Sequence, residues 1–131
     1  MAGKPVLLIT RRLTDAVQAR AARDYQVILN DADHVFSREE LLARCQDVDA
    51  VLPCHSEHFS ADVIADLGDR LRIIANHSVG VDHVDLEAAK KAGIVVTNTP
   101  DVLSDATAEI AMLCMLGAAR RGAEGDAMVR A

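Results

Sequence analysis

Residues 71–97 read LRIIANHSVGVDHVDLEAAKKAGIVVT, and this stretch decides the fold. It begins with the apolar run 71–75 and ends with the apolar run 94–97, both of strand length. Between the two runs, residues 85–92 have helical spacing and Gly93 stands where a C-terminal glycine belongs. Strand, helix and strand in this order predict a βαβ unit with parallel strands.

The same alternation runs through the residues before this unit. Three further runs of strand length are rich in β-branched residues or leucine: 6–10, 25–29 and 49–53. Three further segments have helical spacing: 14–23, 37–45 and 60–67. Repeated βα units with short connections require right-handed crossovers. The sequence therefore predicts an α/β domain of flavodoxin-like or Rossmann-like type, with three layers and a parallel sheet of about five strands.

The segment 102–121 differs from the other predicted helices because apolar or small residues surround it on nearly every side. Such a helix must be buried on several sides, and one sheet covers only one of them. We therefore expect a long interdomain helix, also used for dimerisation, followed by a charged tail that continues toward another domain. The predicted division is a substrate domain over 1–101 and an interdomain segment over 102–131.

Composition excludes several classes of protein. With 131 residues, of which 50% are hydrophobic and 2% aromatic, the chain has length for one domain with an aliphatic core. A formal net charge of -6 argues against nucleic acid and anionic membranes as partners. The start of the chain resembles no signal peptide, and three widely spaced cysteines do not form a disulfide pattern. We expect a cytoplasmic protein with reduced thiols.

Ligands of open α/β sheets bind at the carboxyl ends of the strands, so the loops there are the candidate site. The loop 76–85 is the most unusual, because Gly80 lets the backbone turn its amides outward and form a concavity for an anion such as a carboxylate. On spacing alone, an ordinary glycine turn before an Asp85 helix cap is the simpler interpretation. Both interpretations remain open at this point.

Histidines and a cysteine lie in two of these loops. Cys54, His55 and His58 are potential zinc ligands, but they share one loop and lack a fourth ligand at a usual spacing. A solvent-exposed loop is the better interpretation, and we predict no metal site. His77 and His83 flank the glycine turn, where ordinary hydrogen-bonded histidines are expected.

Residues 76–109, NHSVGVDHVDLEAAKKAGIVVTNTPDVLSDATAE, resemble the D-isomer-specific 2-hydroxyacid dehydrogenase family, and within it the glyoxylate and hydroxypyruvate reductase branch. The resemblance spans the whole chain, and residues 76–109 are its specific part. It implies a substrate site, in which backbone amides hold the substrate carboxylate, and a cofactor-side pair on the long helix. The implied substrate-binding residues are Ser78, Val79, Gly80 and His55, the last on a loop where the family often has an apolar residue. The implied cofactor-side residues are Leu103 and Thr107.

The resemblance further implies NAD(P)-dependent reduction of a small 2-keto acid, glyoxylate or hydroxypyruvate. The family's hydride comes from NADH or NADPH on a second domain, which also supplies the catalytic arginine, glutamate and histidine. None of those three lies in this chain, and its seven glycines never form Gly-x-Gly-x-x-Gly. We therefore expect no catalytic residue and no tight cofactor binding here, an inactive chain when alone, and a homodimer through the 102–121 helix.

Two functions of other classes were weighed against this one. A phosphoacceptor signalling domain needs acids after the first and third strands and a lysine after the fifth. The chain has Thr10-Arg-Arg12, Pro53-Cys54 and Thr97-Asn-Thr99 at those places, so that function is excluded. A small-anion-binding or regulatory α/β module without catalysis stays open, since a fold alone does not guarantee activity.

Overall fold

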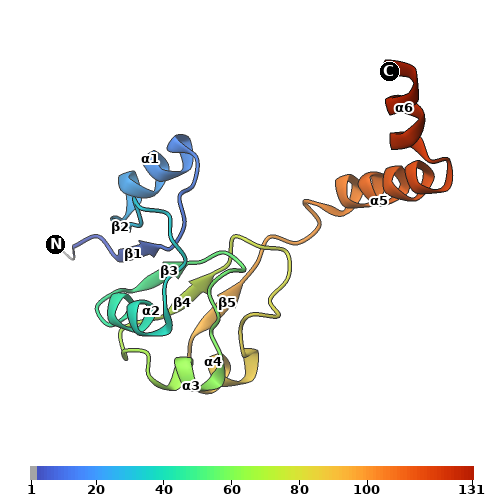
Figure 1. Cartoon of the computed structure of the whole chain (residues 1–131). Coiled ribbons are helices and arrows are strands. Elements are labelled where there is room, and N and C mark those ends of the chain that lie inside the picture. The colour runs from blue at the N-terminus through green and yellow to red at the C-terminus, as the bar shows by residue number, and fades with distance from the viewer. Residues whose placement is uncertain (1–2) are drawn as a thin grey trace. The chain divides into compact units, whose positions relative to one another are not determined.

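The structure, a computed structural model, describes residues 3–131 in two compact units, Met1–Thr99 and Pro100–Ala131 (Figure 1). The first unit alternates strands and helices throughout. Its elements are β1 Val6–Ile9, α1 Asp15–Asp24, β2 Gln26–Leu29, α2 Arg38–Cys45, β3 Ala50–Leu52, α3 Ala61–Ala65, β4 Ile73–Ala75, α4 Leu86–Lys91 and β5 Val95–Thr97.

The five strands form one sheet in the order β2-β1-β3-β4-β5, and every neighbouring pair is parallel. This confirms the predicted α/β class and the parallel sheet of about five strands. The chain moves outward from β1 to β2, and then returns to the other side of β1 to form β3. The strand order thus reverses between β1 and β3, and ligands of such sheets bind at the carboxyl ends near this reversal.

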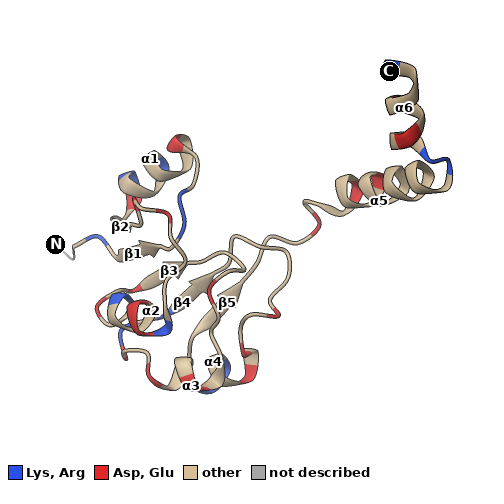
Figure 2. Cartoon of the chain, in the orientation of Figure 1, with Lys and Arg blue, Asp and Glu red and all other residues tan. Residues whose placement is uncertain are grey.

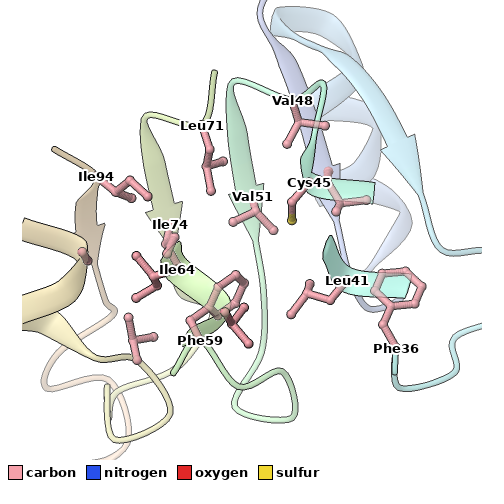
Figure 3. Packing of buried hydrophobic residues seen from close by; sticks show 14 of the residues in the cluster. Phe36, Leu41, Cys45, Val48, Val51, Phe59, Ile64, Leu71, Ile74 and Ile94 are labelled. Atoms are coloured by element: carbon pink, nitrogen blue, oxygen red, sulfur yellow. The ribbon is translucent and has the colours of Figure 1, made fainter. Parts of the chain in front are cut away.

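The two faces of the sheet are covered unequally. Helices α2, α3 and α4 pack on one face, where aliphatic side chains and two phenylalanines form the larger core (Figure 3). On the other face, the smaller cluster around Leu7, Ile9 and Ala50 is joined by partly buried residues that include Ala21 of α1. The core therefore needs few aromatic residues, because aliphatic side chains fill the space between a parallel sheet and its helices.

Local signals in the sequence set several of the helix ends, although Ser60 at the start of α3 makes no side-chain cap. The Ser37 hydroxyl accepts from the Glu40 amide at 3.2 Å while the Glu40 carboxylate accepts from the Ser37 amide at 2.9 Å, which is a complete capping box. Asp85 caps α4 by accepting from the Ala88 amide at 2.9 Å. After α4, Gly93 has a φ of +72°, a conformation that glycine adopts without strain.

The second unit consists of two helices, α5 Ser104–Ala119 and α6 Gly122–Arg130. The predicted long helix is present, but its pattern did not predict α6. The chain leaves α5 at Arg121, whose φ of 51° is left-handed and interrupts the helix. Among residues 3–131, no helix has the length and apolar character that crossing a bilayer requires.

Candidate anion-binding site

The candidate site lies in the first unit, at the carboxyl edge of the sheet. Three segments contribute to it: the loop 53–58 after β3, the loop 76–85 after β4, and residues 97–99 at the end of β5. The His77 amide donates to the Pro53 carbonyl at 2.8 Å, which joins the first two loops at their bases. Parallel pairing brings these segments together, because it places the carboxyl ends of all strands at one edge.

Three consecutive carbonyl groups of the loop 76–85 accept hydrogen bonds from the protein. The Ser78 carbonyl accepts from the Thr99 amide at 2.9 Å, and the Val79 carbonyl accepts from the Asn98 side-chain amide at 2.7 Å. The Gly80 carbonyl accepts from the Ser78 hydroxyl at 2.7 Å. The Ser78 side chain, predicted to lie beside the substrate carboxylate, therefore uses its hydroxyl hydrogen within the loop.

The amides of the same three peptide groups are free to bind a ligand. All described peptide bonds are trans, so each N–H points opposite to the carbonyl of its own peptide. With the carbonyls of residues 78–80 held by the protein, the N–H groups of Val79, Gly80 and Val81 point away from those donors. Within residues 3–99, none of these three amides donates to another protein group. Neighbouring free amides of this kind bind anions.

The glycine in this loop has a different reason from the predicted one. Gly80 does not have a positive φ, so the backbone conformation itself does not require glycine. A Cβ atom built at this position would lie 3.1 Å from the Asp82 Oδ2 atom, the end of an exposed side chain that can move aside. Steric crowding therefore does not require glycine either, and its effect is that no side chain stands beside the free amides.

Asn76 and His83 brace the base of the loop. Asn76 is 4% exposed, and its side-chain amide donates to the Thr97 carbonyl at 3.0 Å. Its Oδ1 atom lies 2.8 Å from Nε2 of His83, so the network assigns the proton of the imidazole to Nε2. Burial lowers the pKa of His83, which favours this neutral, singly protonated ring.

The loop 53–58 is held by the carboxylate of Glu57, which is only 2% exposed. The Glu57 Oε2 atom accepts from the Thr10 hydroxyl at 2.7 Å and from the Cys54 amide at 3.1 Å, and Oε1 accepts from the Ser56 hydroxyl at 3.0 Å. Thr10 follows β1, so this carboxylate ties the loop to the strand on the other side of the reversal point. His55 stands exposed on the loop thus fixed.

Cys54 and His77 connect the two loops a second time. The Cys54 Sγ atom lies 3.7 Å from Nδ1 of His77. Burial, together with the negative charge of Glu57, raises the pKa of the Cys54 thiol. The thiol is therefore protonated near neutral pH and is no activated nucleophile. Among residues 3–131, no three His, Cys, Asp or Glu side chains are grouped so that they could hold a metal ion.

A cavity of about 480 Å³ adjoins the base of the loop 76–85 on the face of the sheet that carries α1. Its floor is apolar, and its polar rim comes from residues that also support the loop, such as Asn76 and Asn98. The lining residues are Arg12, Leu13, Thr14, Val17, Leu52, Ala75, Asn76, His77, Thr97, Asn98 and Thr99. The site is thus a set of free backbone amides beside a largely apolar cavity, whose lining also includes the charged Arg12.

The residues predicted as site residues fall into both units. Ser78, Val79, Gly80 and His55 belong to the first unit, at the edge just described. The predicted cofactor-side pair belongs to the second unit, where the Thr107 amide donates to the Leu103 carbonyl at 2.9 Å in the first turn of α5. Their role toward a cofactor stays a prediction.

Sequence reasoning missed the residues that shape the loop from outside. Thr10, Asn98 and Thr99 entered the sequence analysis only in the comparison with a phosphoacceptor domain, and no role was predicted for Glu57. The sequence did contain a signal for them, because these polar residues lie in or next to segments that follow the carboxyl ends of strands. Buried polar groups at such places are hydrogen-bonded. The partner of each could not be read from the sequence.

Comparison with known proteins identifies the family of the chain. The sequence pattern of "D-isomer specific 2-hydroxyacid dehydrogenase, catalytic domain" matches residues 7–130. Over 127 residues, or 97% of this chain, the chain is 42% identical to a glyoxylate reductase of Thermococcus onnurineus and 41% identical to a glycerate dehydrogenase of Hyphomicrobium methylovorum. It covers only 38% and 39% of those two proteins.

A solved structure shows the same fold. The NADPH-dependent glyoxylate/hydroxypyruvate reductase of Sinorhizobium meliloti, in complex with NADP and malonate, is 27% identical to this chain with a TM-score of 0.68. The match covers 88% of this chain and 34% of that one. Since the family's pattern spans nearly all of the sequence, the chain belongs to the D-isomer specific 2-hydroxyacid dehydrogenases and forms the catalytic domain of that family over residues 7–130.

Proposed function

We propose that the whole protein reduces a small 2-keto acid, glyoxylate or hydroxypyruvate, and that this chain holds the carboxylate of the acid. The observation that carries the proposal is the loop 76–85, whose carbonyls at residues 78–80 are bound by the protein while the amides of Val79 and Gly80 stay free. Relatives named glyoxylate reductase and glycerate dehydrogenase act on acids of this class.

Neutral amides suit this task. A 2-keto acid has to present its carbonyl carbon to a hydride donor while its carboxylate is anchored elsewhere. Backbone amides give hydrogen bonds to a carboxylate that are stronger than those between neutral partners. They are also not acids near neutral pH, so they do not compete with the group that protonates the substrate. Val79 and Gly80 are the residues we assign to this anchor, with His55 facing the rest of the acid from the loop 53–58.

The chemistry beyond binding needs a nicotinamide, which supplies the hydride when bound. The chain itself has no Gly-x-Gly-x-x-Gly sequence, so its residues do not fit the phosphates of a dinucleotide. We therefore assign NADH or NADPH to the part of the protein that lies outside the match, with Leu103 and Thr107 near the nicotinamide. Residues 1–131 alone are proposed to bind the acid without reducing it.

We further propose a division into a substrate domain, 1–101, and an interdomain segment, 102–131, that pairs two copies of the protein. The compact units Met1–Thr99 and Pro100–Ala131 support this division. Beyond its acidic first turns, α5 carries almost no charge (Figure 2). It has no buried residue, and five of its large apolar side chains, together with Leu103 just before it, are more than half exposed: Ile110, Met112, Leu113, Met115 and Leu116. Three free cysteines support a cytoplasmic location.

The alternative function is a small-anion-binding or regulatory module without catalysis. The same loop favours it, because the free amides are complete within residues 3–99 and need no other domain to bind an anion. The two functions differ in whether a reaction follows binding.

A chimera tests both functions. Residues 1–131 are joined to the part of the Thermococcus onnurineus glyoxylate reductase that this chain does not match, and oxidation of NADH and NADPH is followed with glyoxylate and with hydroxypyruvate. We expect turnover by the chimera and none by residues 1–131 alone. A chimera that folds and binds NADPH but reduces neither acid would retract the dehydrogenase proposal in favour of the binding module.

A further inference from the structure

The peptide group between Val79 and Gly80 is held by a side chain from a distant segment. Asn98, which follows β5, donates from Nδ2 to the Val79 carbonyl at 2.7 Å. The residue is exposed, so the hydrogen bond lies at the surface of the carboxyl edge and not within the core. Packing in the core therefore does not explain why an asparagine stands at this position.

The neighbouring peptide groups have other donors. The peptide from Ser78 to Val79 is held by the backbone amide of Thr99, and the peptide from Gly80 to Val81 is held by the hydroxyl of Ser78. Each free N–H is thus oriented by a different group. For the Gly80 N–H, that group is the Asn98 side chain.

This peptide group needs such a donor more than an average peptide does. A peptide plane reverses by coupled rotation about the ψ of one residue and the φ of the next, and the reversed state commonly needs a positive φ at the second residue. Glycine reaches positive φ at no steric cost, so Gly80 makes reversal inexpensive. In the reversed state, the Val79 carbonyl oxygen would face the ligand, where it would repel a carboxylate.

We propose that Asn98 is a positioning residue that keeps the Gly80 N–H directed at the bound carboxylate. The inference rests on the proposed function, since it concerns the same anion-binding loop. A single hydrogen bond of this kind shifts an equilibrium by roughly three- to tenfold. We therefore expect loss of the Asn98 donor to weaken carboxylate binding roughly three- to tenfold, while the fold is retained.

The experiment uses the ¹⁵N-labelled 131-residue chain. Asn98→Ala removes the donor, and Asn98→Asp keeps its size while replacing the donor with an acceptor. Residual dipolar couplings report the direction of the N–H bonds of Val79 and Gly80 without any ligand, and titration with oxalate gives the dissociation constant and the amide shifts. Thr99→Ala is the matched control, because its backbone amide still holds the Ser78 carbonyl.

In both Asn98 variants, we expect a changed coupling and a reduced oxalate shift at Gly80, an unchanged coupling at Val79, and weaker oxalate binding. Thr99→Ala should behave like the unsubstituted chain. If the Gly80 coupling and the oxalate affinity are unchanged in Asn98→Ala, the inference is wrong, whatever the fate of the proposed function. If the unsubstituted chain shows no oxalate shifts at residues 79–81, the proposed carboxylate anchor is wrong, and the coupling at Gly80 still tests the role of Asn98.

Discussion

Arg70 and Asp49 are joined by two parallel hydrogen bonds, from Nε to Oδ1 at 2.9 Å and from Nη2 to Oδ2 at 2.8 Å. Asp49 precedes β3, and its Oδ2 atom also accepts from the Val6 amide at the start of β1, at 2.7 Å. One carboxylate therefore ties together the amino ends of two central strands and the turn before β4. These bonds, those from Arg70 first, lower the pKa of Asp49 to about 2.

Asp49→Asn should make the stability of the domain less dependent on acid. The folded-state pKa lies below the ordinary value of 3.8, so the carboxylate stabilises the fold above about pH 4, and this stabilisation is lost as the pH falls toward 2. Urea unfolding of the unsubstituted chain and of Asp49→Asn at pH 7, 4 and 2.5 measures this loss of stability. The difference in midpoint should be largest at pH 7 and shrink at pH 2.5, and a difference that stays constant would contradict the assignment.

Glu57→Ala should lower the free energy of unfolding by about 2 kcal/mol, because it leaves the buried Thr10 hydroxyl and the Cys54 amide without their acceptor. Glu57→Gln keeps one acceptor oxygen and should cost less. Glu87→Ala, an exposed change of the same kind on α4, serves as control and should be near neutral. Equal midpoints for Glu57→Ala and the control in urea would show that the carboxylate does not hold the loop.

The three thiols should react with a maleimide in a fixed order. Cys114 is exposed on α5 of the single chain and should react first at dilutions where the chain does not self-associate, whereas Cys54 is half-buried with a raised pKa and should react slowly. Burial raises the pKa of Cys45 to about 12, so this thiol should react only in denaturant. Mass spectrometry of peptides after timed labelling gives the order. Labelling of Cys45 in the native chain at the rate of Cys54 would be incompatible with the described core.

The apolar surface of α5 should drive self-association. Leu113→Glu places a charge among exposed apolar side chains and should shift the chain toward monomer in light scattering across a dilution series. Ala19→Glu adds the same charge to an exposed position on α1 and should leave the mass unchanged. If the unsubstituted chain is already a monomer at every concentration, α5 is not a dimerisation surface in this chain.

The sequence allowed most of the fold to be predicted, because its signals are local. The Ser37 capping box, the Gly93 C-terminal glycine and the apolar runs each act within a few residues of their own position. The prediction missed α6, since its start depends on the left-handed conformation of Arg121, which no residue type in that stretch requires. Strand order was also not predicted, because it depends on packing between distant segments.

The candidate site was predicted only in part for the same reason. Gly80 and its neighbours could be found from the loop sequence and from the resemblance to a family. The donors that orient those peptides come from Asn98 and Thr99, about twenty residues later, and the pairing exists only once β4 and β5 are adjacent. The hydrophobic periodicity of the sequence gives no information on contacts between residues so far apart.

The position of β5 at the edge of the sheet has a consequence for synthesis on the ribosome. A domain generally folds as a unit once its residues have left the ribosome. The outer donors of the loop 76–85 come from residues 98 and 99, directly after β5, so the loop is complete only when this strand has paired with β4 at the edge of the sheet. A nascent chain therefore gains the ability to hold a carboxylate only together with the edge strand of its sheet.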